Sequence, residues 1–407
     1  MVDFFMGIKE KIEKIIRLTK QSFSMIYYNF KAKAYKDDPK YKDLWIISER
    51  GTEAKDNGFC FFEYLCEKHP EINARYVIDK EASGDDYKKV EPYKDRLIEY
   101  GSFEHKIAYI LAKYAISSHA GFLEPWSYKL YKLLIDRKDE KVFVFLQHGV
   151  ILHDLSEFLA KNKIKADLFI TTTKREYESI SSSIYGYDSG EVVQTGIARY
   201  DKLNEFELKD EILIMPTWRK NIITPSYMKS DTRDVELFKG SEYFNRFNSL
   251  INNKRLEKAL KEHKIKLVFY PHYEIQPYID CFDCNNSELI LASKDKYDVQ
   301  GLLKSSKAMV TDFSSIQFDF AYMRKPQAYY QFDSIEEHYK MGYFDYDRDG
   351  FGPVYSDEEK LVDYLIKLMD TEFKIEEKYL ERINKDFNIR DSHNCDRIFE
   401  EILKIKK

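Results

Sequence analysis

Short apolar segments alternate with helix-length segments along most of the chain, and this alternation constrains the fold more than any other feature. The first strand-length segments are LWIIS, ARYVID, RLIEYGS, AISSHA, KVFVFLQHG and DLFITTT. Helix-length stretches such as FFEYLCEKHP and HKIAYILAKY separate them. Strands that are joined through helices pair in parallel, so the pattern predicts a doubly wound α/β sheet rather than a β-sandwich.

A second series of the same kind follows, with a long helix expected near residues 245–263. Its strand-length segments are EILIMPTWR, KIKLVFYPHYE, ELILAS, AMVTDFSS and PQAYYQFD. Because 407 residues exceed one ordinary hydrophobic core, two domains are expected. We predict two facing Rossmann-like domains with parallel sheets, at residues 40–205 and 206–385, and a C-terminal helix at 386–407 that packs across both.

Residues 1–36 differ from the rest because apolar side chains recur there at helical spacing among basic ones. Eight Lys or Arg residues stand against three Asp or Glu residues in this segment. The pattern predicts an amphipathic basic helix. Such a helix lies either on an anionic membrane surface or on the body of the protein, and the sequence favours neither. The apolar positions are Phe5, Ile8, Ile12, Ile15, Ile16, Phe23, Ile26, Tyr27 and Phe30.

Composition argues against several classes of protein. The formal net charge of −5 disfavours a general nucleic-acid binder. No stretch approaches the roughly 20 apolar residues that cross a bilayer, and no cleavable leader is evident, so we expect neither an integral nor a secreted protein. Five cysteines, an odd number, are typical of reduced thiols in the cytoplasm. Cys281 and Cys284 lack a second pair at zinc-site spacing, so we expect no cofactor and no metal site there, while metal dependence of any reaction stays open.

Polar residues that directly follow a strand are the informative ones, because ligands of open α/β sheets bind beyond the carboxyl ends of the strands. Five strand ends carry such residues. A single histidine after a strand is more often a loop or capping residue, but several such ends together predict a site for a polyanion. The candidates are His119; His148, Gly149 and His153; Thr217 and Arg219; His272 and Glu274; and Asp312, Ser314 and Ser315.

The stretch VTDFSSIQFDFAY carries the clearest local signal. It predicts a strand that ends at Thr311-Asp312 and passes through Ser314-Ser315 into an apolar helix that holds Asp319. Backbone N–H groups at such a helix start, together with the helix dipole, form a seat for phosphate. Neither a Walker lysine loop nor G-x-G-x-x-G is present, which disfavours a P-loop NTPase and a classical nicotinamide dehydrogenase.

The motifs QHG, TGIARYDKL, PTWR, YPH and VTDFSSIQFDFAYMRKP, followed by a Gly-Pro turn, occur in an order that resembles the CDP-glycerol glycerophosphotransferase family of bacteria. The resemblance runs from about Trp45 to Val354. It implies a GT-B-like transferase, peripheral on the cytoplasmic face of the cell membrane, that moves glycerol phosphate or ribitol phosphate from a CDP-polyol to an acceptor hydroxyl and releases CMP. The implied setting is teichoic acid or capsular polymer synthesis, with a lipid-linked or polymer acceptor.

The resemblance also implies roles for matched residues. His148 corresponds to the general base, acting as a neutral imidazole with a pKa near its ordinary value. His272 would contact or protonate the pyrophosphate, whose charge Arg219 would neutralise. Asp312 would order the turn, and Asp319 would face the nucleotide ribose or else bind a neighbouring strand. Thr217, Ser314 and Ser315 would bind donor phosphate on the second domain, and His119, Gly149, His153 and Arg199 would lie on the acceptor side, in the first domain.

Two departures from the family pattern bear on the acceptor. The usual Thr-Pro after His-Gly is Val150-Ile151 here, and the usual Pro-Arg after the Gly-x pair is Ala198-Arg199. The first change lies where the acceptor should bind, so it leaves acceptor identity open. A GT-B glycosyltransferase that uses a nucleotide sugar is the alternative function, and a catalytically silent membrane-bound scaffold is a second one. A homo-oligomer is neither predicted nor excluded.

Overall fold

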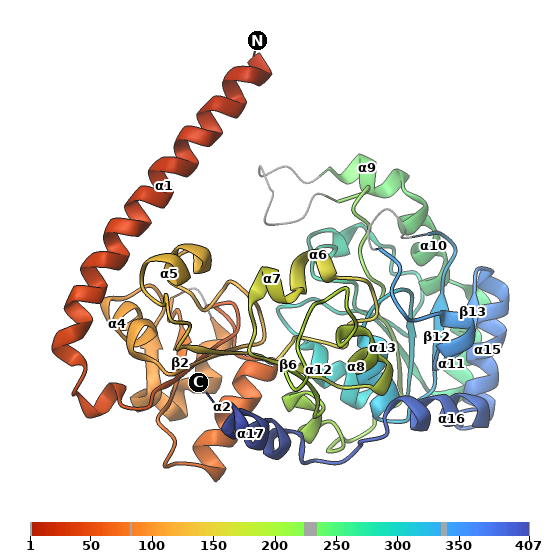
Figure 1. Ribbon diagram of the computed structural model, residues 1–407. Helices are drawn as coiled ribbons and strands as arrows, with labels where there is room; N and C mark the ends of the chain where they lie inside the picture. The colour runs from red at the N-terminus through yellow and green to blue at the C-terminus, as the bar shows by residue number, and fades with distance from the viewer. Residues whose placement is uncertain (1, 82–83, 224–233, 335–339, 407) are drawn as a thin grey trace.

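The computed structural model describes residues 2–81, 84–223, 234–334 and 340–406, with side chains from Ile12 onward. Thirteen strands in the described part of the chain form two sheets, and each sheet belongs to one domain (Figure 1). Every pair of neighbouring strands is parallel. The predicted GT-B-like architecture of two Rossmann-like domains is therefore confirmed.

The first domain contains the seven-stranded sheet, in the order β3-β2-β1-β4-β5-β6-β7. Strands β1, β4, β5 and β6 are buried along their whole length, as expected for a parallel sheet that is covered by helices on both faces. The strands are β1 (Trp45–Ser48), β2 (Ala74–Ile78), β3 (Leu97–Glu99), β4 (Tyr114–Ser117), β5 (Val142–Phe145), β6 (Leu168–Thr171) and β7 (Val192–Gln194). The helices are α2 (Asn57–Lys68), α3 (Asp85–Val90), α4 (Phe103–Leu111), α5 (Tyr128–Leu134), α6 (Ser156–Leu159), α7 (Lys161–Ile164) and α8 (Lys174–Ile180).

The second domain repeats this topology in six strands, in the order β10-β9-β8-β11-β12-β13. The strands are β8 (Glu211–Ile214), β9 (Lys266–Phe269), β10 (Leu289–Leu291), β11 (Ala308–Thr311), β12 (Gln327–Tyr330) and β13 (Val354–Tyr355). The helices are α9 (Val235–Gly240), α10 (Glu242–Ile251), α11 (Lys254–His263), α12 (Val299–Ser305), α13 (Ile316–Tyr322), α14 (Tyr346–Asp349) and α15 (Glu358–Asp370). In each sheet the chain order reverses beside the first strand, between β1 and β4 and between β8 and β11. These switch points are where open α/β sheets bind ligands.

The prediction of a single long helix near residues 245–263 is wrong. The chain forms α10 and α11 instead, with a break at Asn252-Asn253. The side chain of Asn253 accepts hydrogen bonds from the backbone N–H groups of Arg255 and Leu256, at 3.0 and 3.1 Å. An asparagine in this capping position starts a new helix because it satisfies N–H groups that have no partner within the helix.

The C-terminal segment crosses from the second domain back to the first. Helix α16 (Glu377–Asp386) ends at Asp386, which accepts a hydrogen bond from Arg175 Nε of the first domain at 2.9 Å. Helix α17 (Asn394–Lys404) packs beside α2, and the N–H of Asn394 donates to Asp201 Oδ1 at 2.7 Å (Figure 1). The tail therefore ties the two domains together.

Helix α1 (Val2–Ala32) projects from the first domain, and only its C-terminal half is packed (Figure 1). Met25 is fully buried. Gln21 Oε1 accepts from Ser127 N at 3.1 Å, and Ser24 Oγ accepts from Trp126 Nε1 at 3.1 Å, so this half is held at the start of α5. Within the described residues, none of the helices is both long enough and apolar enough to cross a bilayer.

A buried ion pair connects the two domains near their facing edges. Arg199, in a 3₁₀ turn after β7, donates from Nε and Nη2 to the two carboxylate oxygens of Asp319 in α13, at 2.8 and 2.9 Å. Asp319 is 1% exposed and Arg199 is 8% exposed. The hydroxyl of Tyr200 also donates to Asp319, at 3.2 Å. Removing one partner of such a pair leaves an uncompensated buried charge.

Replacing Asp319 by Ala should lower the free energy of unfolding by about 3–5 kcal/mol, because Arg199 would keep its charge in a buried site. Asp363→Ala is the matched control. Asp363 pairs with Arg255 at the surface, where the side chains are 61% and 53% exposed, and its loss should cost below about 1 kcal/mol. Urea denaturation of both variants measures the difference, and equal losses would contradict this reading of the pair.

Candidate active site

The carboxyl ends of the two sheets meet between the domains. A methyl group placed on Gly149, after β5, would lie 3.4 Å from Ser315 Oγ, at the start of α13. The loop after β5 therefore lies within van der Waals distance of the start of α13, where the two edges approach each other. The residues predicted to form the acceptor side and those predicted to seat the donor phosphate lie on opposite walls of this junction.

The loop that carries His148 is held in an unusual conformation. Gln147 has a φ of 61°, in the left-handed region. Its side-chain Nε2 donates to Ile170 O at 2.5 Å and to Glu176 Oε1 at 3.1 Å. The same Glu176 oxygen accepts from the N–H of Ile151 at 2.7 Å, so one buried carboxylate fixes the loop on both sides of His148.

His148 and His119 stack as nearly parallel rings. Their centroids lie 4.9 Å apart with an interplanar angle of 17°. The His148 side chain keeps part of its surface open to solvent, while the protein atoms packed around the ring displace much of its water. This desolvation, with the positive charges of Arg50 and Arg199, lowers the pKa of His148 to about 4, well below the ordinary value that we expected. Burial and the neighbouring His148 lower the pKa of His119 to about 2. Both rings are therefore neutral near pH 7 and can accept a proton.

The opposite wall provides the expected start of α13. The backbone N–H groups of Ser314 and Ser315 donate to no other group in the described part of the chain. Ser314 Oγ accepts from Ile316 N at 3.4 Å. Two adjacent free N–H groups near the positive end of a helix suit an anion. Phosphate binding at Ser314 and Ser315 stays a prediction, which this geometry supports.

Arg219 is engaged with carboxylates of its own domain. Its Nη1 donates to Asp312 Oδ2 at 2.9 Å, and its Nε and Nη2 donate to the two oxygens of Asp333 at 2.8 and 2.9 Å. Asp312 Oδ1 also accepts from the N–H of Thr217 at 2.8 Å and of Phe313 at 2.7 Å. Asp312 thus orders the turn, whereas the predicted contacts of Arg219 and Thr217 with phosphate are not tested by this arrangement.

His272 lies after β9 on the same wall. Its ring is half-buried and stacks on Trp218, with centroids 6.2 Å apart. Its Nδ1 accepts from the N–H of Glu274 at 3.3 Å, while Glu274 itself is buried. A role at the donor pyrophosphate stays a prediction for His272.

Two other predicted residues, Asp319 and His153, do not take part in the ring stack of His148 and His119. Asp319 binds Arg199 of the first domain rather than a neighbouring strand, and contact with a ribose stays a prediction. His153 lies on a segment that packs against residues 340–342 of the second domain, where Asp154 N donates to Lys340 O at 3.1 Å. Arg199 contacts the loop that carries His148, since its Nη1 donates a hydrogen bond to the carbonyl of His148 at 2.8 Å.

Sequence reasoning missed the polar group that follows β1. Buried Glu49 accepts from the N–H groups of Asp56 and Phe59, at 2.8 and 2.9 Å. Burial, with the charge of Asp56, raises the pKa of Glu49 to about 8. Asn57 Nδ2 donates to Gln147 O at 2.7 Å, which links the segment after β1 to the loop that carries His148. The available signal was the polar run ERGTEAKDNG directly after the strand WIIS.

The described residues contain no group of three or more His, Cys, Asp or Glu side chains that could hold a metal ion. Cys281 is buried, Cys284 is exposed, and both are free thiols.

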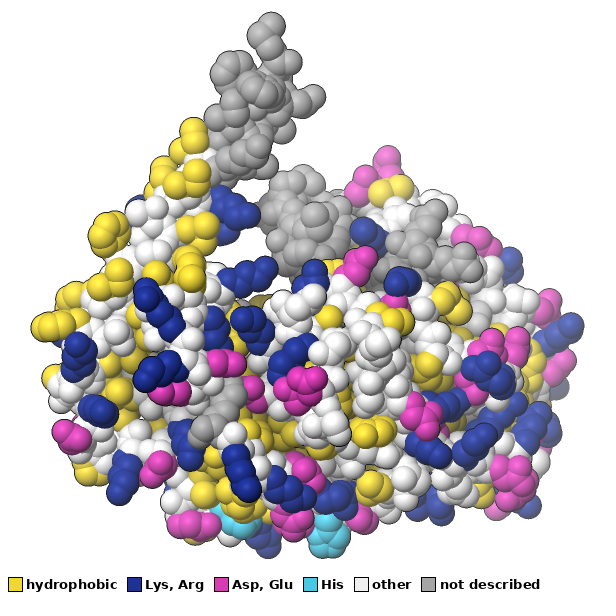
Figure 2. All heavy atoms as spheres, viewed as in Figure 1, with side chains coloured by type: hydrophobic (Ala, Val, Ile, Leu, Met, Phe, Trp, Pro, Cys, Tyr) yellow, Lys and Arg dark blue, Asp and Glu magenta, His cyan; other side chains and the backbone are white. Residues whose placement is uncertain are grey.

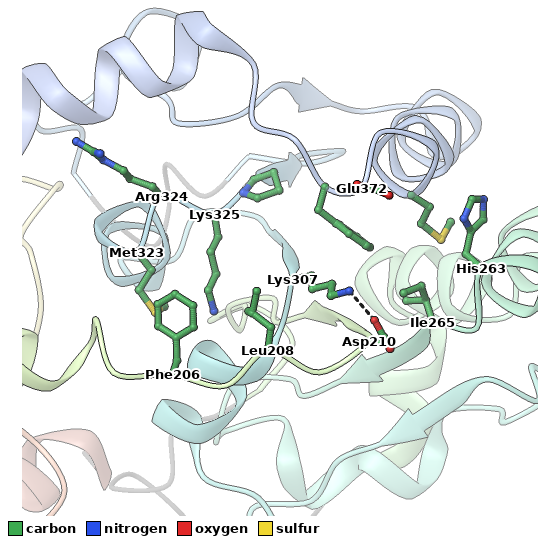
Figure 3. A pocket seen from close by; sticks show the side chains of 13 residues that line it. Phe206, Leu208, Asp210, His263, Ile265, Lys307, Met323, Arg324, Lys325 and Glu372 are labelled. Carbon is green, nitrogen blue, oxygen red and sulfur yellow. Dashed lines mark hydrogen bonds and ion pairs between the residues drawn. The ribbon is translucent and has the colours of Figure 1, made fainter.

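A cavity of about 610 Å³ lies at the amino ends of the strands in the second domain (Figure 3). Its cations already have partners. Lys307 Nζ pairs with Asp210 at 2.5 Å, and Lys325 Nζ donates to the carbonyls of Leu303 and Ser306 at 2.8 and 3.0 Å. This cavity faces away from the strand ends that carry the predicted site, so it does not belong to the candidate active site.

Two facing Rossmann-like domains, each with a parallel sheet, define a GT-B-like protein. The family model for CDP-glycerol:poly(glycerophosphate) glycerophosphotransferase matches residues 29–404. The chain belongs to this family, as the order of its motifs indicated.

Known relatives agree with this assignment. The chain is 36% identical over 365 residues to the minor teichoic acid biosynthesis protein GgaB of Bacillus subtilis (strain 168), covering 89% of this chain and 40% of GgaB. It is 24% identical over 387 residues to a teichoic acid poly(glycerol phosphate) polymerase of Staphylococcus epidermidis, covering 89% of this chain and 47% of that one. The chain thus spans less than half the length of these relatives.

Solved structures support the fold. The structure of the wall teichoic acid polymerase TagF superposes with a TM-score of 0.65 at 18% identity, covering 99% of this chain and 98% of the solved chain.

The ring of His148 should titrate near pH 4, so that it stays neutral down to about pH 5. Arg50→Gln should raise this pKa toward the ordinary 6.5, because it removes a nearby positive charge. Arg75→Gln, on β2, is the control and should leave it unchanged. Imidazole NMR signals, assigned with a His148→Asn variant, measure the titration, and a wild-type midpoint near 6.5 would contradict the prediction.

Proposed function

We propose that this protein transfers glycerol phosphate or ribitol phosphate from a CDP-polyol donor to an acceptor hydroxyl and releases CMP, in bacterial teichoic acid or capsular polymer synthesis. The proposal rests on the meeting of Gly149 and Ser315, which sets a neutral histidine opposite a free pair of backbone donors. Membership of the glycerophosphotransferase family supports it. The acceptor would be a lipid-linked or polymeric polyol phosphate.

The reaction follows from these positions. His148 takes the proton of the acceptor hydroxyl, and the oxygen attacks the phosphorus that carries the polyol. The bond from that phosphorus to the bridging oxygen breaks, and CMP leaves with the bond's electron pair. The N–H groups of Ser314 and Ser315 stabilise the charge that grows on the leaving phosphate, and His272 contacts or protonates it. No covalent enzyme intermediate is required, since base and anion seat suffice for in-line displacement.

CMP release should require a CDP-polyol, a phosphate-containing acceptor and His148. Replacing His148 by Ala should lower turnover by about 10²- to 10⁴-fold while leaving donor affinity largely intact, because the histidine acts on the acceptor. His263→Ala, beside the cavity at the opposite strand ends, is the matched control and should retain full activity.

CDP-glycerol, CDP-ribitol and nucleotide sugars should be tested side by side in this assay. Turnover of a nucleotide sugar alone would support the glycosyltransferase alternative. Absence of turnover with every donor would support the alternative of a catalytically silent, membrane-bound scaffold. A near-normal rate in the His148→Ala variant would contradict the assignment of His148 as the general base.

We propose further that the protein works at the inner face of the cell membrane, held there by α1. The described part of this helix exposes large apolar side chains and basic ones together (Figure 2). Phe23 and Phe30 are 71% and 68% exposed. An apolar strip flanked by lysine and arginine is typical of helices that lie in the interface of an anionic membrane. The strip comprises Ile12, Ile15, Ile16, Phe23, Ile26, Tyr27 and Phe30, and the exposed basic residues include Lys14, Arg17, Lys20 and Lys31.

Replacing Phe23, Ile26 and Phe30 together by Gln should weaken binding to vesicles that contain anionic lipid. These side chains contribute apolar area to the interface and little to the packed half of α1, so the fold should persist. Binding should also fall with rising salt, since part of the attraction is electrostatic. Phe158→Gln and Leu403→Gln, at exposed positions on other helices, serve as controls. Unchanged co-sedimentation of the triple variant would show that α1 does not attach the protein.

A further inference from the structure

We propose that Arg50 binds a phosphate group of the acceptor, next to the hydroxyl that His148 deprotonates. The proposal rests on the proposed function and deepens it by locating an acceptor subsite in the first domain. The ligand class is a phosphodiester or phosphate monoester on the polyol chain that is extended.

The register of the sheet places Arg50 beside the two histidines. Ser48 of β1 pairs with Ser117 of β4, and Ser117 pairs with Phe145 of β5. Arg50 and His119 each lie two residues beyond these paired positions, and His148 lies three beyond. Neighbouring strands run about 4.8 Å apart, so the three residues leave the sheet close together, at the switch point between β1 and β4.

The electrostatics of the histidines agree with this placement. The positive charge of Arg50 contributes to the low pKa of both His148 and His119. Because the Arg50 guanidinium is close enough to affect both rings, it can also contact an anion that binds next to His148 and His119.

Arg50 also retains hydrogen-bonding capacity. Its Nε is buried and has no hydrogen-bond partner among the described residues. Its ion pair with Glu53 is long, with 3.8 Å between Nη1 and Oε1, and Glu53 also pairs with Lys55 at 3.2 Å. The Arg50 side chain is 38% exposed, so its guanidinium is open to an anion that would also accept from Nε.

The other two arginines at these strand ends are already committed. Arg199 binds Asp319 and Asp56, and Arg219 binds Asp312 and Asp333. Each guanidinium therefore has two carboxylates as partners. Arg50 differs because its acidic partner among the described residues, Glu53, lies 3.8 Å away and also pairs with Lys55.

The chemistry of the acceptor identifies the anion. A guanidinium presents a planar fork of donors that matches two oxygens of one phosphate. The donor phosphates are assigned to Ser314 and Ser315 on the opposite wall, so the phosphate at Arg50 comes from the other substrate. In a polyol-phosphate chain the terminal hydroxyl is a few bonds from a phosphodiester, which fits a base after β5 and an arginine after β1, with only β4 between these two strands.

The test compares two acceptors that differ only in phosphate, glycerol 3-phosphate and glycerol, with the full chain. In the wild type kcat/KM should be higher for glycerol 3-phosphate. Arg50→Gln should lower the ratio of the two kcat/KM values by about 10- to 100-fold, chiefly through KM for the phosphorylated acceptor. Arg50→Lys should restore part of the ratio. Arg75→Gln removes another arginine whose Nε is buried without a partner, but from β2, and should leave the ratio unchanged.

An unchanged ratio in a folded Arg50→Gln variant, with wild-type thermal midpoint, would overturn the proposal. If Arg50→Gln fails to fold, Arg50→Lys decides by the same ratio. Calorimetric binding of glycerol 3-phosphate tests Arg50 without turnover, and equal affinity in wild type and variant would also overturn it. Absence of CMP release by the wild type with every CDP-polyol contradicts the proposed function instead, so the two failures are distinguishable.

Discussion

The ion pair between Arg199 and Asp319 is the interaction on which the geometry of the site depends. One guanidinium binds Asp319 of the second domain, Asp56 at the start of α2, and the carbonyl of His148. Helix α13, the loop that carries His148 and the start of α2 are therefore fixed relative to one another through a single side chain. Because a buried charge is costly without its partners, partial separation of these elements is unfavourable. This coupling holds the proposed base and the proposed anion seat in a fixed relation.

Most of the fold could be predicted from the sequence because both parallel sheets are built from buried, continuously apolar strands. The rule that ligands bind beyond the carboxyl ends of strands singled out His148, Gly149 and Ser315, and the structure brings Gly149 and Ser315 close together. Two short strands at the sheet edges, β7 and β13, were missed because three and two residues give little pattern. The break at Asn253 was missed because a capping asparagine looks like any other polar residue on a helix.

Partners of the charged residues could not be predicted, because they are remote in sequence. Arg199 and Asp319 are 120 residues apart, and Arg219 and Asp333 are 114 apart. The first pair depends on how the two domains meet and the second on how distant strands of one sheet are placed, and no local pattern records either. The α1 segment shows a related limit. Its sequence allowed packing or exposure, and in the C-terminal half of α1 the structure divides these between two faces, with Met25 buried and Phe23 exposed.

The same positive charges that keep His148 neutral also suit the substrates proposed for the site. Desolvation and the charges of Arg50 and Arg199 disfavour the imidazolium, which lowers the pKa of His148 to about 4. A weak base of that kind would remove a hydroxyl proton poorly. Phosphate groups that enter the junction bring negative charge to the same cations, and a nearby anion raises the pKa of a histidine. In the reaction proposed above, binding of the phosphorylated substrates would therefore raise the pKa of His148 and make it a stronger base.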